Sequence, residues 1–299
     1  MKLNYKGEFT MYTLFTDTDT DITPEIAKKY GYKLISMPYT IEGKEVYPYV
    51  DFDKFDYHAF YDRLRKGVIP TTSALSPVNY IDYFEPEFKK GLDILYVHFS
   101  AAMSGTFNAL RLALEELKEK YPERTVHCID TKGITLGSYN ICLSIGELYK
   151  AGKSIEEIKQ WAEEEVDKYA VYFYADDLKF FGKSGRVSGF AAFMGNIIGL
   201  KPIIFMDSDG VMKTKAKCRG RAQSLNKLLD YVDELQEDMR EHRVIIAHAD
   251  CEDIANELAD LFRKRFGDDI KLEFDVVNPT AGSHCGPNTI GISFHAKHR

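Results

Sequence analysis

Short runs of apolar and β-branched residues alternate with helix-like segments over the first half of the chain. Strands are predicted at residues 12–16, 34–39, 92–99 and 125–129. The 3–4 spacing of a buried helix face is clearest at Phe107, Leu110, Leu114 and Leu117. Strands that alternate with helices through short connections pair in parallel. The pattern therefore predicts a three-layer α/β/α unit with a mainly parallel sheet.

The pattern changes in the second half of the chain. Alternating residues at 202–206 and 211–218, joined by Ser208-Asp209-Gly210, predict a β-hairpin. Further strands and helices are expected at residues 223–239, 243–249, 254–266 and 272–277, followed by a glycine-rich tail. This half is predicted to be a two-layer α+β unit. We therefore expect two domains, residues 1–165 and 166–299, with a ligand between them.

Composition and charge narrow the classes of function. The 299-residue chain is 44% hydrophobic and 28% charged, which is typical of a soluble globular protein. Its formal net charge is −7 and it has no dense run of Lys and Arg, so nucleic acid is not an expected partner. No stretch of about 18 apolar residues predicts a membrane span, and the polar N-terminus does not resemble a signal peptide. A reduced, cytoplasmic protein is expected.

The five cysteines do not form a recognisable pattern. Their number is odd, and no two lie within five residues of each other. This spacing favours neither a disulfide framework nor a zinc or redox motif. No HExxH motif is present, and no second histidine lies near His284 at a metal-ligand spacing. Neither a metal site nor a cofactor site is predicted.

Two hydroxyl-rich segments are candidates for ligand contact. Ser104-Gly105-Thr106 follows a buried strand and opens a helix, where free N–H groups favour a carboxylate or a phosphate. The alternative is that Ser104 only caps the helix. The loop around Thr72 and Ser73 is the second segment, and on its own it is more typical of a structural turn.

A basic turn precedes an apolar stretch near residue 185. Gly182-Lys183-Ser184 matches the end of a phosphate-binding loop, but Asp177 replaces that motif's first glycine, so this function is rejected. The apolar residues that follow either pack in a core or line a pocket. Arg219 lies in a small basic cluster that is typical of a solvated surface. His284 lies in a segment too glycine-rich to be predicted as a helix or a strand.

Taken in order, these segments resemble the DegV family of bacterial fatty-acid-binding proteins over about Tyr12–Phe294. The resemblance rests on Thr16-Asp17-Thr18 with Asp21, Thr72 to Pro77, Ser104-Gly105-Thr106, Asp130-Thr131-Lys132 with Gly137, Gly185-Arg186-Val187-Ser188, Lys201-Pro202-Ile203, Asp209-Gly210, Arg219, and His284 with Gly286-Pro287. The chain departs from the family pattern at Thr18, Ala74-Leu75, Ser100-Ala101 and Ser184-Gly185. These departures bear on the acyl-chain preference more than on the mode of binding.

The resemblance implies one long-chain fatty acid in a tunnel between the domains. Thr72 and Ser104 would hydrogen-bond its carboxylate, and His284 would complete the network. The residues expected at the ligand are Thr72, Ser73, Ser100, Ser104, Gly105 and His284. The residues expected to line the tunnel are Phe99, Phe190, Phe193, Met194 and Ile198.

The resemblance also implies a protein partner. A separate fatty acid kinase would convert the presented carboxylate into an acyl-phosphate for phospholipid metabolism, and Arg186 and Arg219 would serve that encounter. The chain is then a carrier and not an enzyme, and any contact with a membrane would be transient. Two alternatives remain open: a hydrolase that uses a serine with His284, and a phosphate- or sugar-binding protein with a polar cleft.

Overall fold

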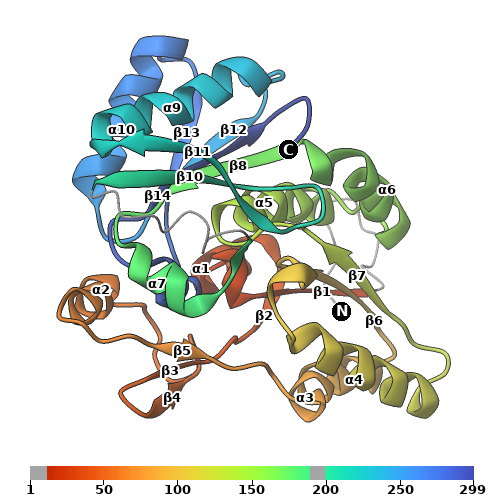
Figure 1. Ribbon diagram of the computed structural model, residues 1–299. Coiled ribbons are helices and arrows are strands. Elements are labelled where there is room, and N and C mark those ends of the chain that lie inside the picture. The colour runs from red at the N-terminus through yellow and green to blue at the C-terminus, as the bar shows by residue number, and fades with distance from the viewer. Residues whose placement is uncertain (1–11, 189–198) are drawn as a thin grey trace.

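The computed structural model describes residues 12–188 and 199–299, and its strands form three sheets (Figure 1). The first is a four-stranded parallel sheet, the second is a seven-stranded mixed sheet, and the third is a small antiparallel sheet. No described helix is long and apolar enough to cross a membrane.

The parallel sheet has the strand order β2-β1-β6-β7. Its strands are β1 (Tyr12–Asp17), β2 (Tyr32–Ile35), β6 (Asp93–His98) and β7 (Val126–Asp130). Its helices are α1 (Pro24–Tyr30), α3 (Pro77–Phe88), α4 (Thr106–Lys120), α5 (Leu136–Lys150) and α6 (Ile155–Glu165). Helices α3 and α4 pack together on one side, and α1 and α5 lie on the other (Figure 1). The predicted α/β unit with a parallel sheet is therefore confirmed.

The mixed sheet has the strand order β13-β12-β14-β8-β10-β11-β9. Its strands are β8 (Tyr169–Tyr174), β9 (Val187–Ser188), β10 (Leu200–Met206), β11 (Met212–Arg219), β12 (Arg243–His248), β13 (Lys271–Val276) and β14 (Ile290–His295). Helices α9 (Gly220–Leu235) and α10 (Glu252–Phe266) cover one face (Figure 1). Helices α7 (Leu178–Ser184) and α11 (Pro279–Cys285) contact each other, and α11 also contacts β3 and β5.

Strand β8 shows how the two halves of the protein share a core. Its side chains alternate between faces, as in any strand. Ala170, Tyr172 and Tyr174 pack into the core under α9 and α10. Val171 and Phe173 belong instead to the large core that contains the parallel sheet. The mixed sheet is therefore buried on both faces at its centre, and one of those faces packs in the same core as the parallel sheet.

The small sheet has the order β4-β3-β5 and lies beside the parallel sheet. Its strands are β3 (Tyr39–Ile41), β4 (Lys44–Val46) and β5 (Thr71–Thr72), with α2 (Tyr57–Arg65) between β4 and β5. The predicted single strand over residues 34–39 is wrong, because the chain leaves β2 at Ile35 and starts a new sheet at Tyr39.

The end of the chain also differs from its prediction. The expected glycine-rich tail is helix α11 followed by β14, which pairs with β12 and β8 in the middle of the mixed sheet. Its glycines allow close packing. A Cβ at Gly291 would lie 2.6 Å from Phe173 Cβ, and a Cβ at Gly282 would lie 2.5 Å from the Tyr61 hydroxyl oxygen. Glycine here results from crowding and not from a loop.

Candidate functional site

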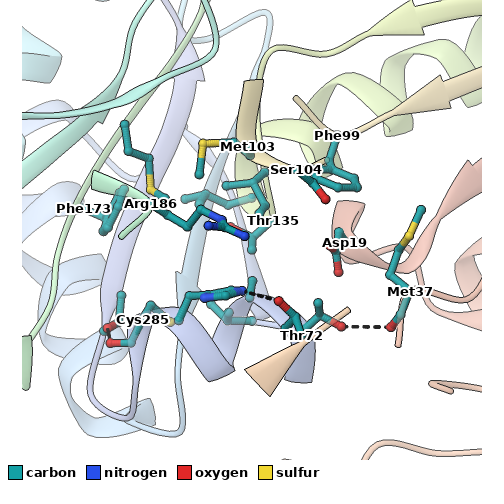
Figure 2. A pocket seen from close by; sticks show the side chains of 18 of the residues that line it. Asp19, Met37, Thr72, Phe99, Met103, Ser104, Thr135, Phe173, Arg186 and Cys285 are labelled. Atoms are coloured by element: carbon teal, nitrogen blue, oxygen red, sulfur yellow. Dashed lines mark hydrogen bonds between the residues drawn. The ribbon is translucent and has the colours of Figure 1, made fainter. Parts of the chain in front are cut away.

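A pocket lies between the parallel sheet and the mixed sheet (Figure 2). It encloses about 910 Å³ of space free of protein atoms, a volume that includes open solvent at its mouth. Its walls come from the segments after β1 and β6, from β8 and β12, and from α11. The carboxyl ends of parallel strands, where β1 and β6 stop, are the usual place for a ligand in an open α/β sheet.

The inner walls of the pocket are mostly apolar. They include Phe99, Leu136, Val171, Phe173, Phe181 and Met212, all of which are buried. Val171 and Phe173 reach the pocket because they occupy the same face of β8. Beside them, Gly291 also lines the pocket, and its lack of a side chain lets Phe173 pack closely against it. Such walls suit a hydrocarbon chain and offer little to a sugar.

Thr72 and His284 meet at the pocket although they are 212 residues apart in the chain. The Thr72 Oγ1 atom lies 2.9 Å from His284 Nε2. Strand β5 holds Thr72 opposite Tyr39 of β3, and α11 carries His284. The prediction that His284 lies in a loop is therefore wrong. Sequence patterns gave no sign of this pairing, and only the family resemblance placed the two residues together.

His284 is held in its neutral form. Burial, and secondly the positive charge of Arg186, lower the pKa of His284 from 6.5 to about 4. Arg186 lines the same pocket and follows Gly185, whose left-handed conformation ends α7. A neutral imidazole has one N–H group, so the ring can donate to Thr72 Oγ1 while the Thr72 hydroxyl donates elsewhere.

Ser104 lines the pocket just before α4. Its Oγ accepts a hydrogen bond from the Thr106 N–H group at 3.2 Å, so the serine satisfies one N–H group at the start of α4 and also lines the pocket. Gly105 is the N-cap residue and lies along a neighbouring surface groove that also includes Arg186. Ser73 lines the pocket, with its hydroxyl donating to Glu45 Oε1 at 2.9 Å.

The structure does not place every predicted site residue at the pocket. Ser100 is fully buried, and its hydroxyl donates to the Gly210 carbonyl at 2.8 Å, which joins the end of β6 to the β10–β11 turn. Arg219 ends β11 and is not among the residues that line the pocket. Phe99 does line it. The remaining predicted tunnel residues, Phe190, Phe193, Met194 and Ile198, lie outside the described residues.

Three buried carboxyl groups lie at the end of β1 and directly after it, where the sequence predicted only a polar turn. Asp17 accepts hydrogen bonds from the Tyr96 hydroxyl and the Phe99 N–H group, while burial raises its pKa to about 7. Asp21 accepts two hydrogen bonds from Asn278. These two carboxyls therefore serve the structure. The third, Asp19, lines the pocket.

Outside the pocket, His58, Asp250 and Glu252 bring potential metal-ligand atoms within 4.8 Å of one another. The His58 ring is 2.5 Å from Asp250, and Arg65 also binds that carboxylate. Glu252 accepts a hydrogen bond from the Tyr57 hydroxyl at 2.7 Å. With these partners the cluster fastens α2 to the segment between β12 and α10.

The surroundings of His284 disfavour the hydrolase alternative. In the described part of the chain, the one hydrogen bond recorded for the His284 ring joins it to a threonine and not to a serine. A low pKa also makes this imidazole a weak general base at neutral pH.

Comparisons with known proteins agree on one family. A family model described as "Uncharacterised protein, DegV family" matches residues 11–297. A DegV domain-containing protein of Clostridium perfringens is 32% identical over 284 residues, covering 95% of this chain and 97% of the relative.

Solved structures share the fold. A fatty acid binding DegV family protein of Streptococcus agalactiae has a TM-score of 0.83 at 23% identity, covering 97% of this chain and 100% of that one. A DegV family protein of Ruminococcus gnavus with vaccenic acid has a TM-score of 0.81 at 23% identity, covering 95% and 100%.

Proposed function

The chain belongs to the DegV family, and from this premise we propose that it binds one long-chain fatty acid in the pocket between its two larger sheets. The solved relative from S. agalactiae is described as a fatty acid binding protein. The solved relative from R. gnavus is described with vaccenic acid. The observation that carries the proposal is the pocket itself, which combines apolar inner walls with a hydroxyl and imidazole pair.

The apolar walls account for affinity. Burying a CH₂ group contributes about 0.8 kcal/mol, so a chain of about sixteen carbons gains on the order of 10 kcal/mol before the cost of ordering it. Phe99, Phe173 and Phe181 offer the ring surfaces against which such a chain packs.

The carboxylate is proposed to lie at Thr72 and Ser104. The Thr72 hydroxyl donates to the carboxylate and accepts from the neutral His284 ring. Ser104 adds a second hydroxyl donor, since its oxygen already accepts from the Thr106 N–H group. A buried carboxylate is costly without such donors. Arg186 adds a positive charge at the same end of the pocket.

We also propose that the bound carboxylate is presented to a separate fatty acid kinase. That enzyme would transfer a phosphoryl group from a nucleoside triphosphate to a carboxylate oxygen, giving an acyl-phosphate and a nucleoside diphosphate. Arg186 supports this role because it lines both the pocket and the exposed groove beside Gly105. Arg219, exposed at the end of β11, is the second proposed docking residue.

Native mass spectrometry of delipidated protein tests the binding proposal. The protein should take up one equivalent of a long-chain fatty acid, and Ser104→Ala should weaken uptake about tenfold by removing a carboxylate donor. Ser208→Ala, which removes an exposed hydroxyl from the β10–β11 turn, is the matched control. Equal affinities of Ser104→Ala and the parent would refute the assignment of the head group.

The presentation proposal has a separate test. Loaded protein mixed with a purified bacterial fatty acid kinase should support acyl-phosphate formation, and Arg186→Gln should slow it more than it weakens fatty acid binding. If the kinase acts on the Arg186→Gln and Arg219→Gln proteins as well as it acts on the parent protein, the docking role is contradicted.

A further inference from the structure

Among the described residues that line the pocket, Asp19 is the one that carries a carboxyl group. It lies in the short helix η1 (Thr18–Thr20) that follows β1, and its relative exposure is 5%. Figure 2 shows it beside Phe99 and Met37, both of which also line the pocket. The family resemblance rests on Asp17 and Asp21, so it does not account for the carboxyl group between them.

The backbone of Asp19 is satisfied, and the Thr280 hydroxyl also hydrogen-bonds to its carboxyl, but one carboxyl oxygen has no partner among the described residues. Its N–H group donates to Asp17 Oδ1 at 3.0 Å, and its carbonyl accepts from the Thr135 N–H group at 2.9 Å. In contrast, the buried Oδ1 atom has no hydrogen-bond partner among the described residues. Buried polar groups are nearly always hydrogen-bonded, so this atom calls for a partner that the chain itself does not supply.

The carboxyl of Asp19 suits a neutral partner. Burial, followed by the nearby carboxyls of Asp17 and Asp21, raises the pKa of Asp19 well above its usual value. A protonated carboxyl both donates and accepts a hydrogen bond, as an alcohol does. Thr135, a buried neighbour that also lines the pocket, makes no capping hydrogen bond with its side chain.

The position of Asp19 differs from that of the head-group residues. Ser73 and Arg186 are exposed, and Thr72 and Ser104 are partly exposed, so these four mark the mouth. Asp19 and Thr135 are buried, and therefore lie on the inner wall along which the chain of a bound fatty acid would run.

We propose that the pocket takes a long-chain fatty acid whose chain carries a hydroxyl group, and that this group hydrogen-bonds to the Asp19 carboxyl. The inference rests on the proposed fatty acid binding and specifies the class of acid. A plain hydrocarbon chain would leave the Asp19 Oδ1 atom unpartnered next to CH₂ groups, which is unfavourable. A hydroxyl at the matching carbon would remove that penalty.

The test compares stearic acid with a panel of stearic acids that each carry one hydroxyl at a different carbon. Delipidated protein should bind at least one hydroxylated isomer about tenfold more tightly than stearic acid. Asp19→Leu should abolish this preference, and Asp19→Asn should retain most of it because an amide also donates and accepts. Asp260→Asn, at a highly exposed aspartate of α10, is the control. If Asp19→Leu does not fold, Asp19→Ala takes its place.

The outcomes separate the two claims. A parent protein that binds stearic acid as tightly as every hydroxylated isomer would overturn the inference and leave fatty acid binding intact. A parent preference that persists in Asp19→Leu would also overturn it. If Asp19→Leu weakens stearic acid and its hydroxylated isomers equally, Asp19 contacts the carboxylate head and the assignment is wrong. No binding of any member of the panel would refute the proposed function itself.

Discussion

The mouth of the pocket and its inner wall are built in different ways. The mouth consists of hydroxyl, imidazole and guanidinium groups on β5, α11 and the segments before α4 and after α7, and it keeps contact with solvent. The inner wall consists of buried aromatic and aliphatic side chains on the face of β8 and its neighbours. Area buried at the wall contributes most of the binding free energy, whereas hydrogen bonds at the mouth fix the orientation of the ligand.

The largest expected effect comes from filling the wall. Ala247 of β12 is 1% exposed and lines the pocket. Ala247→Phe places a ring where the chain would lie, so fatty acid affinity should fall at least about a hundredfold, while overpacking costs about 1–3 kcal/mol of stability. Titration with a fluorescent fatty acid measures the first and chemical denaturation the second. Ala222→Phe, on an exposed part of α9, should leave affinity unchanged. Unchanged affinity in Ala247→Phe would place the ligand elsewhere.

The mouth should lose stability in acid because of His284. His284 has a pKa of about 4 in the folded protein against 6.5 ordinarily, so the unfolded chain binds a proton first as the pH falls. The stability due to neutral His284 is therefore complete above pH 6.5 and lost by about pH 4, at most about 3 kcal/mol.

Denaturation of the parent and of His284→Gln across this pH range measures the effect. The parent should lose more of its free energy of unfolding than the variant does. His298→Gln, at an exposed histidine, should follow the parent. Parallel pH profiles for the parent and His284→Gln would show that burial of His284 does not control its protonation.

A smaller effect is expected from one hydroxyl at the mouth. Thr72→Val keeps the shape of the side chain but removes both the donor to the carboxylate and the acceptor for His284. Affinity for a fatty acid should fall about tenfold, with a much smaller change for the corresponding fatty alcohol. Equal losses for acid and alcohol would mean that Thr72 does not contact the carboxylate.

The smallest effect is expected at Ser100, which is close to Ser104 in the sequence but has a different role. Ser100 joins the two halves of the protein through the Gly210 carbonyl, whereas Ser104 faces the pocket. Ser100→Ala should lower stability by about 1 kcal/mol and leave affinity almost unchanged. Thermal denaturation and fatty acid titration of the variant check both parts. A loss of affinity without a loss of stability would move Ser100 back to the ligand.

The sequence predicts the parallel unit well because its information is local. Apolar spacing marks α4, and a capping box formed by Ser154 and Glu157 marks the start of α6. The prediction from sequence fails at α11 and β14. There, Tyr61 and Phe173 from distant segments leave no room for a side chain at Gly282 and Gly291. Local patterns could not reveal such contacts.

The residues of the site also divide into those that local sequence patterns reveal and those that depend on distant contacts. Ser104 is visible as a hydroxyl after a buried strand, because helix starts have a sequence signature. The Thr72–His284 pair is not visible locally, because β5 and α11 bring together residues that are 212 positions apart, and the family resemblance alone indicated it. Asp19 was missed as a pocket residue because an acidic turn looks the same whether it is solvated or buried.

The most direct measurement is a crystal structure of the protein with a long-chain fatty acid brominated at its terminal carbon. The account predicts one molecule per chain, with its carboxylate within hydrogen-bond distance of Thr72 and Ser104 and with anomalous density for bromine among the buried side chains of the inner wall. Bromine at the mouth with the carboxylate inside, or a fatty acid bound only on the surface, would contradict it.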